Sequence, residues 1–345
     1  MPHAARPTVT LHDVAAAAGV SVSTASRVLG GSSRTVAPEY QERVLAAAAT
    51  LRYTADASAR AMRRASDSIT LIVDDLTTPS IGMVVAAMER EARTAGAFVT
   101  VSSTGGTPDR QLETVRRLRA LRPRAIVLTS SRLDADLVGG RLLGELRAYE
   151  RDGGRVVIVG DTDMPFDSIS FDNHAAARAL GAYVAETGHR EVVILAGDVA
   201  RANVTTRATG FIEGLRAGGV APDSIRVVHC EVSRRGGSEA IRGSLGGFTD
   251  VDAVLAANDL IAVGAMSALR AAGVSVPADV SVTGFDDIQL AVDVMPRLTT
   301  VALPLADAGA EAIRLAVREG TEPAHLTMSG HLVVRDSALP RTRPR

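Results

Sequence analysis

The chain of 345 residues contains one cysteine, no tryptophan, no lysine and only 3% aromatic residues. Cys230 has no second cysteine with which to form an internal disulfide or a metal cluster, so we expect a protein of a reducing compartment, the cytoplasm. Because aromatic side chains are few, a ligand pocket has few rings on which to stack a base. The sequence has no apolar run of about 18 residues and no signal-peptide core near its start, so we expect neither a membrane helix nor export.

Sequence motifs of the common enzyme classes are also missing. No G-x-G-x-x-G follows the first predicted strand, and there is no Walker loop, no H-E-x-x-H and no G-x-S-x-G motif. The seven histidines are scattered, and Cys230 has no obvious base partner. We therefore expect no catalysis, no cofactor and no metal site, and an enzyme of unknown class remains only as an alternative.

The net charge is near zero, but it is unevenly distributed. The first 66 residues carry eight arginines and four acidic residues, a balance of +4, whereas the whole chain carries −1 and the remainder therefore −5. A basic N-terminal segment on an acidic body favours nucleic-acid binding by that segment. At 345 residues the chain is long enough for a small module followed by one large or two medium α/β units, and its 46% of apolar residues suffices for sizeable cores.

Residues 9–29 predict two short helices joined at a glycine. Apolar residues recur with the helical period in the first helix, and Thr10 and Asp13 have the spacing of a capping box at its start. Ser21 is placed to cap the second helix. The inner face of that helix consists of Ala25, Val28 and Leu29. Two short helices with this spacing are typical of a helix-turn-helix, and Pro38 predicts the start of a third helix.

The second helix has the features of a DNA-recognition helix. The N-terminal part of such a helix contacts base edges in a major groove. The residues that would face outward there are Val22, Ser23, Ser26 and Arg27. Arg27 is the strongest candidate for a guanine contact. From these residues alone, an ordinary pair of helices with a solvated polar face remains an open alternative.

The same segment resembles the LacI family of bacterial transcriptional regulators. The family's ordered residues occur as Thr10-Leu11-His12-Asp13-Val14-Ala15, Gly19-Val20-Ser21 and Thr24-Ala25-Ser26-Arg27-Val28-Leu29. Further family motifs, among them Gly284-Phe285-Asp286-Asp287, extend the resemblance from residue 8 to about residue 336. The resemblance implies a transcriptional regulator, most often a repressor, that binds a palindromic operator as a homodimer. The DNA contacts that it implies are Thr10, Ser21, Val22, Ser23, Thr24, Ser26, Arg27, Arg34, Ala59 and Met62.

The resemblance also implies a hinge helix within residues 55–67 that orders when two subunits bind an operator. Met62 stands where the family has a leucine that wedges into the minor groove, and a bulky apolar side chain suits that role. Ala55 and Asp56 replace the family's proline and asparagine, so we expect a hinge that is held less tightly than usual. A polar linker with an incidental methionine is the alternative.

From Ser68 onward, short apolar runs alternate with helical stretches such as residues 82–95 and 110–121. The predicted strands are residues 69–73, 98–102, 125–128, 155–159, 192–195, 225–229, 253–256 and 281–283. Alternation of this kind predicts parallel sheets with helices on both faces. The sequence therefore predicts two Rossmann-like α/β lobes behind an all-α head.

The resemblance adds a fold like that of periplasmic binding proteins, in which the chain crosses between the lobes three times. The domains that follow are a head at 8–54, a hinge at 55–67, a first lobe at 68–164 and 296–326, and a second lobe at 165–295 and 327–340. A periplasmic-type solute-binding protein shares this fold. It needs an export signal and has no DNA-binding head, so it is the less favoured alternative.

By the same resemblance, a small-molecule effector binds between the lobes, where the carboxyl ends of parallel strands face a crevice. The implied effector residues are Asp161, Phe171, Arg207, Asn258 and Asp286. The alternatives are that Asp286 and Asn258 cap helices and that Arg207 pairs with a structural carboxylate. Ser80 and Ile81 stand where the family often has a pair of phenylalanines, so a nucleobase effector is less favoured than a sugar or sugar derivative, the family default.

Overall fold

The computed structural model describes residues 9–29, 36–51, 53, 66–129, 136–197, 202–244 and 251–341. Contacts divide the chain into two compact units, Met1–Ser66 with Ala120–Arg122, and the remainder. Within the described ranges, no helix is both long enough and apolar enough to span a membrane.

Three helices form the head, by which we mean the described residues between Val9 and Tyr53. They are α1 (Leu11–Ala18), α2 (Val22–Leu29) and α3 (Pro38–Thr50). Small apolar side chains fill the space between them: Val14, Ala15, Ala18, Ala25, Val44, Ala47 and Ala48. The turn after α1 lies at Gly19, whose φ is +64° and whose added Cβ would lie 2.4 Å from the guanidinium of Arg43. The positive φ favours glycine there, whereas the end of the Arg43 side chain could move aside. The predicted all-α head is confirmed.

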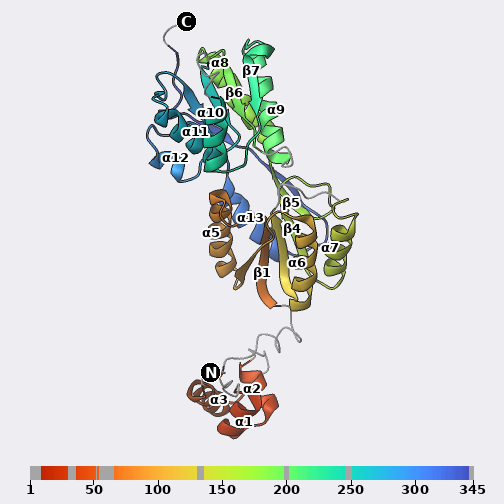
Figure 1. The fold of residues 1–345 in the computed structure, drawn as a ribbon. Coiled ribbons are helices and arrows are strands. Elements are labelled where there is room, and N and C mark those ends of the chain that lie inside the picture. The colour runs from red at the N-terminus through yellow and green to blue at the C-terminus, as the bar shows by residue number, and fades with distance from the viewer. Residues whose placement is uncertain are drawn as a thin grey trace, which may run out of the picture. The chain divides into compact units, whose positions relative to one another are not determined.

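The first lobe is a six-stranded sheet with helices on both faces. Its elements are β1 (Ser66–Val73), α5 (Pro79–Thr94), β2 (Phe98–Ser103), α6 (Pro108–Leu121), β3 (Pro123–Thr129), α7 (Arg141–Arg151), β4 (Arg155–Val159), β5 (Asp167–Phe171), α13 (Leu305–Val317) and β11 (His325–Met328). The strand order is β11-β5-β4-β3-β1-β2, and the pairs β1–β2, β3–β4, β4–β5 and β5–β11 are parallel. Alternate strand residues pack on α5 and α13 on one face and on α6 and α7 on the other (Figure 1).

The second lobe repeats the design with a four-stranded parallel sheet, in the order β7-β6-β8-β9. Its elements are α8 (Asn173–Glu186), β6 (Val192–Leu195), α9 (Ala202–Ala217), η1 (Pro222–Ser224), β7 (Ile225–Val228), α10 (Arg234–Ser244), β8 (Ala253–Ala256), α11 (Asp259–Ala271), β9 (Ser281–Thr283), α12 (Leu290–Asp293), β10 (Thr300–Ala302) and β12 (His331–Val333). Helices α8 and α9 cover one face of the sheet, and α10 and α11 cover the other. The predicted α/β fold with two parallel-sheet lobes is confirmed.

The strand pairings correct the lobe boundaries that were drawn from the sequence. Strand β5 pairs with β4 and β11, which places all three in the first lobe. Strand β10 pairs with β12, and Thr299 bridges to Thr283 at the end of β9, which places β10 in the second lobe. The boundaries at 164/165, 295/296 and 326/327 are therefore wrong by a few residues. The three crossings lie between Phe171 and Asn173, between Ala302 and Leu305, and between Met328 and His331.

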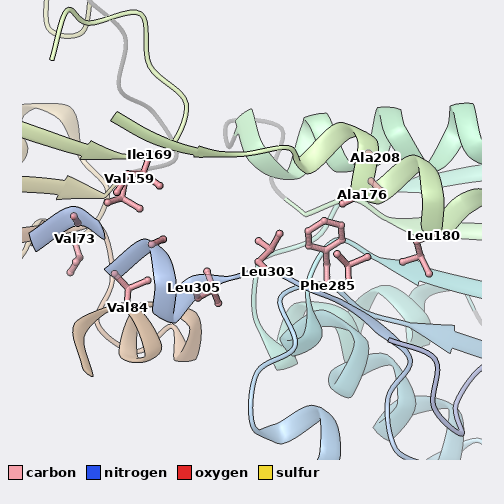
Figure 2. Packing of buried hydrophobic residues seen from close by; sticks show 14 of the residues in the cluster. Val73, Val84, Val159, Ile169, Ala176, Leu180, Ala208, Phe285, Leu303 and Leu305 are labelled. Carbon is pink, nitrogen blue, oxygen red and sulfur yellow. The ribbon is translucent and has the colours of Figure 1, made fainter. Parts of the chain in front are cut away.

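A continuous buried apolar cluster joins the two lobes along one crossing. It includes residues from both sheets and from the segment that leads into α13. Figure 2 shows Leu303 and Leu305 on that segment, between Phe285 of the second lobe and Val84 of the first. The lobes therefore share core residues at the point where the chain passes from one to the other.

Candidate functional site

The N-terminus of α1 is held by Thr10 and Asp13. The Thr10 backbone N–H donates to Oδ2 of Asp13 at 2.8 Å, and the Asp13 backbone N–H donates to the Thr10 hydroxyl at 3.4 Å. The hydrogen bonds from Thr10, above all that of its backbone N–H, lower the pKa of Asp13. The predicted capping box is confirmed, so the Thr10 hydroxyl already serves the helix start.

Ser21 caps α2, and the exposed face of this helix carries Ser23 and Arg27. The Ser21 hydroxyl accepts the Thr24 backbone N–H at 3.1 Å and lies 2.8 Å from the Ser23 hydroxyl. Ser23 and Arg27 are exposed and lie one helical turn apart, so they share one face of α2. The half-buried predicted contacts on this helix are Val22, Thr24 and Ser26. The remaining predicted DNA contacts, Arg34, Ala59 and Met62, lie outside the described residues. All of the DNA contacts stay predictions.

We expect Ser21→Ala to destabilise α2, because the first-turn N–H of Thr24 then loses its side-chain acceptor and keeps only the Ser21 carbonyl. The cost is about 1 kcal/mol, or about a fivefold fall in amide hydrogen-exchange protection across α2. Ser23→Ala is the matched control, since it removes the same hydroxyl from an exposed position that accepts no backbone N–H in the described hydrogen bonds. Equal protection in Ser21→Ala and the wild-type protein would contradict the capping role.

A cleft lies between the lobes, at the carboxyl ends of the parallel strands of both sheets. Asp74 and Asp161 follow β1 and β4 in the first lobe, and Asn258 and Asp286 follow β8 and β9 in the second. All five predicted effector residues line this cleft: Asp161, Phe171, Arg207, Asn258 and Asp286. Residues distant in sequence meet here because parallel strands end at the same edge of a sheet.

Arg207 is the most firmly held side chain of the cleft. Only 4% of its surface is exposed, and its Nη1 lies 2.9 Å from Oδ1 of Asp286. Nη1 also donates to the Ala257 carbonyl and Nε to Oδ1 of Asn173, each at 2.8 Å, and the guanidinium lies 4.1 Å from the ring centroid of Phe285. Burial raises the pKa of Asp286 above its ordinary value, although the nearby Arg207 opposes the rise. Arg207 thus pairs with a carboxylate, as the alternative interpretation of the sequence proposed, but this carboxylate, Asp286, itself lines the cleft.

Asn258 and Asp161 approach the cleft from opposite lobes. Oδ1 of Asn258 accepts the Ile261 backbone N–H at 2.9 Å, so Asn258 caps α11 as the sequence alternative proposed, and it also lines the cleft. Burial raises the pKa of Asp161, and the positive charge of Arg207 partly offsets this rise. Phe171 supplies the aromatic ring among the described lining residues.

The sequence reasoning missed several polar residues of the cleft: Asp74, Asp75, Asn173 and Asn203. Asp74 and Asp75 directly follow β1, a position that could have identified them. Asn173 orients Arg207 from the first turn of α8. Asn203 lies in α9, and its Oδ1 is buried without a hydrogen-bond partner in the described part of the chain. No strand precedes it closely, so its place in the cleft had no sequence signal.

Comparison with known proteins matches both units of the chain. Residues 10–56 match the bacterial regulatory proteins of the lacI family, and residues 182–338 match a periplasmic binding protein-like domain. The chain is 33% identical to the HTH-type transcriptional regulator CelR of Thermobifida fusca, over 95% of this chain and 98% of CelR. The chain belongs to the LacI family. This LacI-family chain is also 29% identical to the regulator GalR of Escherichia coli (strain K12), over 89% of this chain and 88% of GalR.

Solved structures of the LacI family have the same fold. The lac repressor dimer bound to operator and the anti-inducer ONPF is 27% identical, with a TM-score of 0.79 over 96% of this chain and 99% of the repressor chain. The CelR–cellobiose complex is 30% identical, with a TM-score of 0.70 over 96% of this chain and 100% of CelR. The expectation of a DNA-binding transcriptional regulator of the LacI family is therefore confirmed.

Proposed function

We propose that this LacI-family regulator is a repressor whose affinity for operator DNA is controlled by a small molecule in the interlobe cleft. The observation that carries the proposal is the cleft itself, since both lobes contribute polar side chains to it at strand ends. A ligand that contacts both lobes binds their closed arrangement better than their open one and so shifts the equilibrium between them.

A homodimer on a palindromic operator is the assembly that we propose. Two heads related by a two-fold axis match two half-sites of a palindrome. The lac repressor, similar over almost its whole length, is a dimer on its operator. In the DNA-bound state, Met62 of each subunit would wedge into the central minor groove, and Ser23 and Arg27 would contact bases in the major groove.

The effector is a sugar or sugar derivative. Carboxylates and amides accept and donate hydrogen bonds in directions that suit a polyhydroxylated ring, and Phe171 offers it an apolar surface. Asp161, Phe171, Arg207, Asn258 and Asp286 are the residues that we assign to the contact. The relatives point the same way, because CelR is known in complex with cellobiose and another relative, 29% identical, is the ribose operon repressor of Haemophilus influenzae.

The protein works without catalysis. Relatives that cover about nine-tenths of the chain or more are named as transcriptional regulators, and the polar groups of the cleft suit binding of an intact ligand. Because the operator is chromosomal DNA, we place the protein in the cytoplasm.

The test of this function is a thermal-shift screen of neutral sugars, each paired with its phosphorylated form. We expect at least one neutral sugar to stabilise the protein by about 2.7 kcal/mol at a concentration of 100 times its Kd. The phosphorylated partner should give a smaller shift, because Asp74, Asp75, Asp161 and Asp286 line the described cleft with Arg207 as its cation. The stabilising sugar should also change the affinity for DNA from upstream of the protein's own gene in a gel-shift assay. Stronger stabilisation by the phosphate than by the sugar would contradict the charge argument.

A further inference from the structure

The loop that carries Asp286 into the cleft has an unfavourable backbone. Asp286 has a φ of +107° and Asp287 a φ of +54°, values that residues with a Cβ rarely adopt. Such conformations persist only where the surroundings fix them. The loop, residues 284–288, therefore needs anchors that hold Asp286 against Arg207.

One anchor is the ion pair between Asp287 and Arg335. The two side chains make a bidentate contact, with Nη1 of Arg335 2.6 Å from Oδ1 and Nη2 3.0 Å from Oδ2. Nη1 of Arg335 also donates to the Leu298 carbonyl at 2.9 Å. This anchor ties the loop to the segment after β12.

The second anchor is Asp259, the first residue of α11, which is completely buried. Its Oδ2 accepts the Ile288 backbone N–H at 2.9 Å, and its Oδ1 accepts the hydroxyl of Thr300 in β10 at 2.6 Å. Its own backbone N–H donates to the Phe285 carbonyl at 2.9 Å. A Cβ added to Gly284 would lie 2.2 Å from Oδ1 of Asp259, so the loop can approach this carboxyl only through a glycine. Asp259 thus hydrogen-bonds near both ends of the loop, through its backbone N–H at Phe285 and through its carboxyl at Ile288.

The charges around Asp259 favour its neutral form. The negative charges of Asp286 and Asp287 face it from the loop. The two nearby arginines are already paired with these carboxylates, Arg207 of α9 with Asp286 and Arg335 with Asp287. Strand β10 contributes the uncharged Thr300. Burial, followed by the charge of Asp286, raises the pKa of Asp259 to about 8, although the Thr300 and Ile288 hydrogen bonds oppose the rise. A protonated Asp259 can still accept the Ile288 N–H while it donates to the Thr300 hydroxyl.

We propose that Asp259 is a positioning residue for effector recognition: it holds the strained 284–288 loop so that Asp286 faces the cleft. The inference rests on the proposed function only for the statement that Asp286 binds the effector. Asp259 itself touches no ligand, because it is fully buried behind the loop.

The raised pKa gives this anchor a pH dependence with a definite sign. Opening the loop hydrates Asp259 and returns its pKa toward 3.8, so the closed loop binds the proton more tightly than the open loop. The contribution of Asp259 to closure is complete below that ordinary value and is lost progressively as the pH rises to about 8. Asp286 should therefore be held less well, and an effector bound less tightly, at the alkaline end of this range.

Hydrogen exchange of the ligand-free full-length protein tests the proposal. Protection of a peptide covering residues 284–288, corrected for the intrinsic exchange rate, should fall by roughly tenfold or more between about pH 6 and about pH 8 in the wild-type protein. Asp259→Asn retains an acceptor for Ile288 and a donor for Thr300, so its protection should fall by less than about threefold over that range. Asp259→Ala should leave the Ile288 amide unprotected at both pH values, because that N–H loses its acceptor. The Gly284 and Asp286 amides, which donate to the carbonyls of Thr299 and Val301, should keep more protection, and peptides from β8 should stay protected.

Asp252→Asn is the matched control. Asp252 is also buried in the second lobe, but its carboxylate accepts the backbone N–H groups of Arg190 and Glu191 and contacts Arg341, away from the loop. In Asp252→Asn, protection of the peptide covering residues 284–288 should follow the same pH profile as in the wild-type protein. Parallel profiles for the wild-type protein and Asp259→Asn, or wild-type protection of the Ile288 amide in Asp259→Ala, would overturn the proposal. If Asp259→Ala does not fold, the comparison of Asp259→Asn with the wild-type protein decides. No sugar or DNA enters this experiment, so a failed effector screen leaves its outcome valid.

Discussion

Asp286→Ala should abolish the thermal shift that the stabilising sugar gives with the wild-type protein. It should also lower the free energy of unfolding of the ligand-free protein by about 3–5 kcal/mol, measured by urea denaturation, because it leaves a buried arginine without its counter-charge. Asp286 is only 7% exposed, and Arg207, its partner at 2.9 Å, is 4% exposed. This one residue therefore links ligand recognition to the stability of the second lobe.

Two further variants separate these effects. Asp286→Asn keeps a hydrogen-bond acceptor for Arg207, so it should lose less stability than the alanine variant while still weakening the sugar. Asp336→Ala breaks the exposed pair with Arg297, in which both side chains are about half exposed, and should keep both the full sugar shift and nearly wild-type stability. A full sugar shift in Asp286→Ala would place the effector elsewhere.

The sequence predicted which residues line the cleft because the ends of its buried strands can be located from apolar runs. Asp161, Asn258 and Asp286 each follow an apolar run that the periodicity identifies as a buried strand, and parallel strands bring such positions to one edge. The resemblance to the family then selected among them. Arg207 was selected by resemblance alone, since no local pattern reveals that a helix in the middle of the lobe points an arginine into the cleft.

The strands that the sequence did not reveal are short or polar. β10 and β12 have three residues each, and β5 and β11 mix polar with apolar residues, so none forms an apolar run. Their pairings join residues far apart in the sequence, such as Thr300 with Val333. This is why the lobe boundaries were misplaced by a few residues while the two-lobed fold was correct.

The role of Asp259 also lay beyond the sequence. The residue follows the helix cap Asn258, where an acidic side chain is ordinary. Only the fold shows that the 284–288 loop closes over it and turns this carboxyl into a buried anchor. Local sequence thus predicted the helix start, and long-range packing determined what its first residue does.

Arg27→Ala should weaken binding to the operator by about 1–3 kcal/mol, or roughly 5- to 150-fold, while binding to scrambled DNA changes much less. Arg27 is exposed on the same face of α2 as Ser23, and its outward neighbours on the helix are small, so few other side chains of α2 can form bidentate contacts with a base. The measurement is fluorescence anisotropy on operator and scrambled duplexes at one fixed salt concentration, because phosphate contacts make affinity strongly salt-dependent.

Arg27→Lys distinguishes base reading from simple charge. Lysine keeps the positive charge but lacks the rigid fork of the guanidinium, so this variant should bind scrambled DNA like the wild-type protein and still lose much of its preference for the operator. Arg216→Ala, which removes an exposed arginine from the last turn of α9 in the second lobe, should change neither affinity. Equal losses on operator and scrambled DNA in Arg27→Ala would show that Arg27 contacts phosphate. Operator discrimination would then have to come from other residues of the head and from the hinge, where Met62 is the predicted wedge.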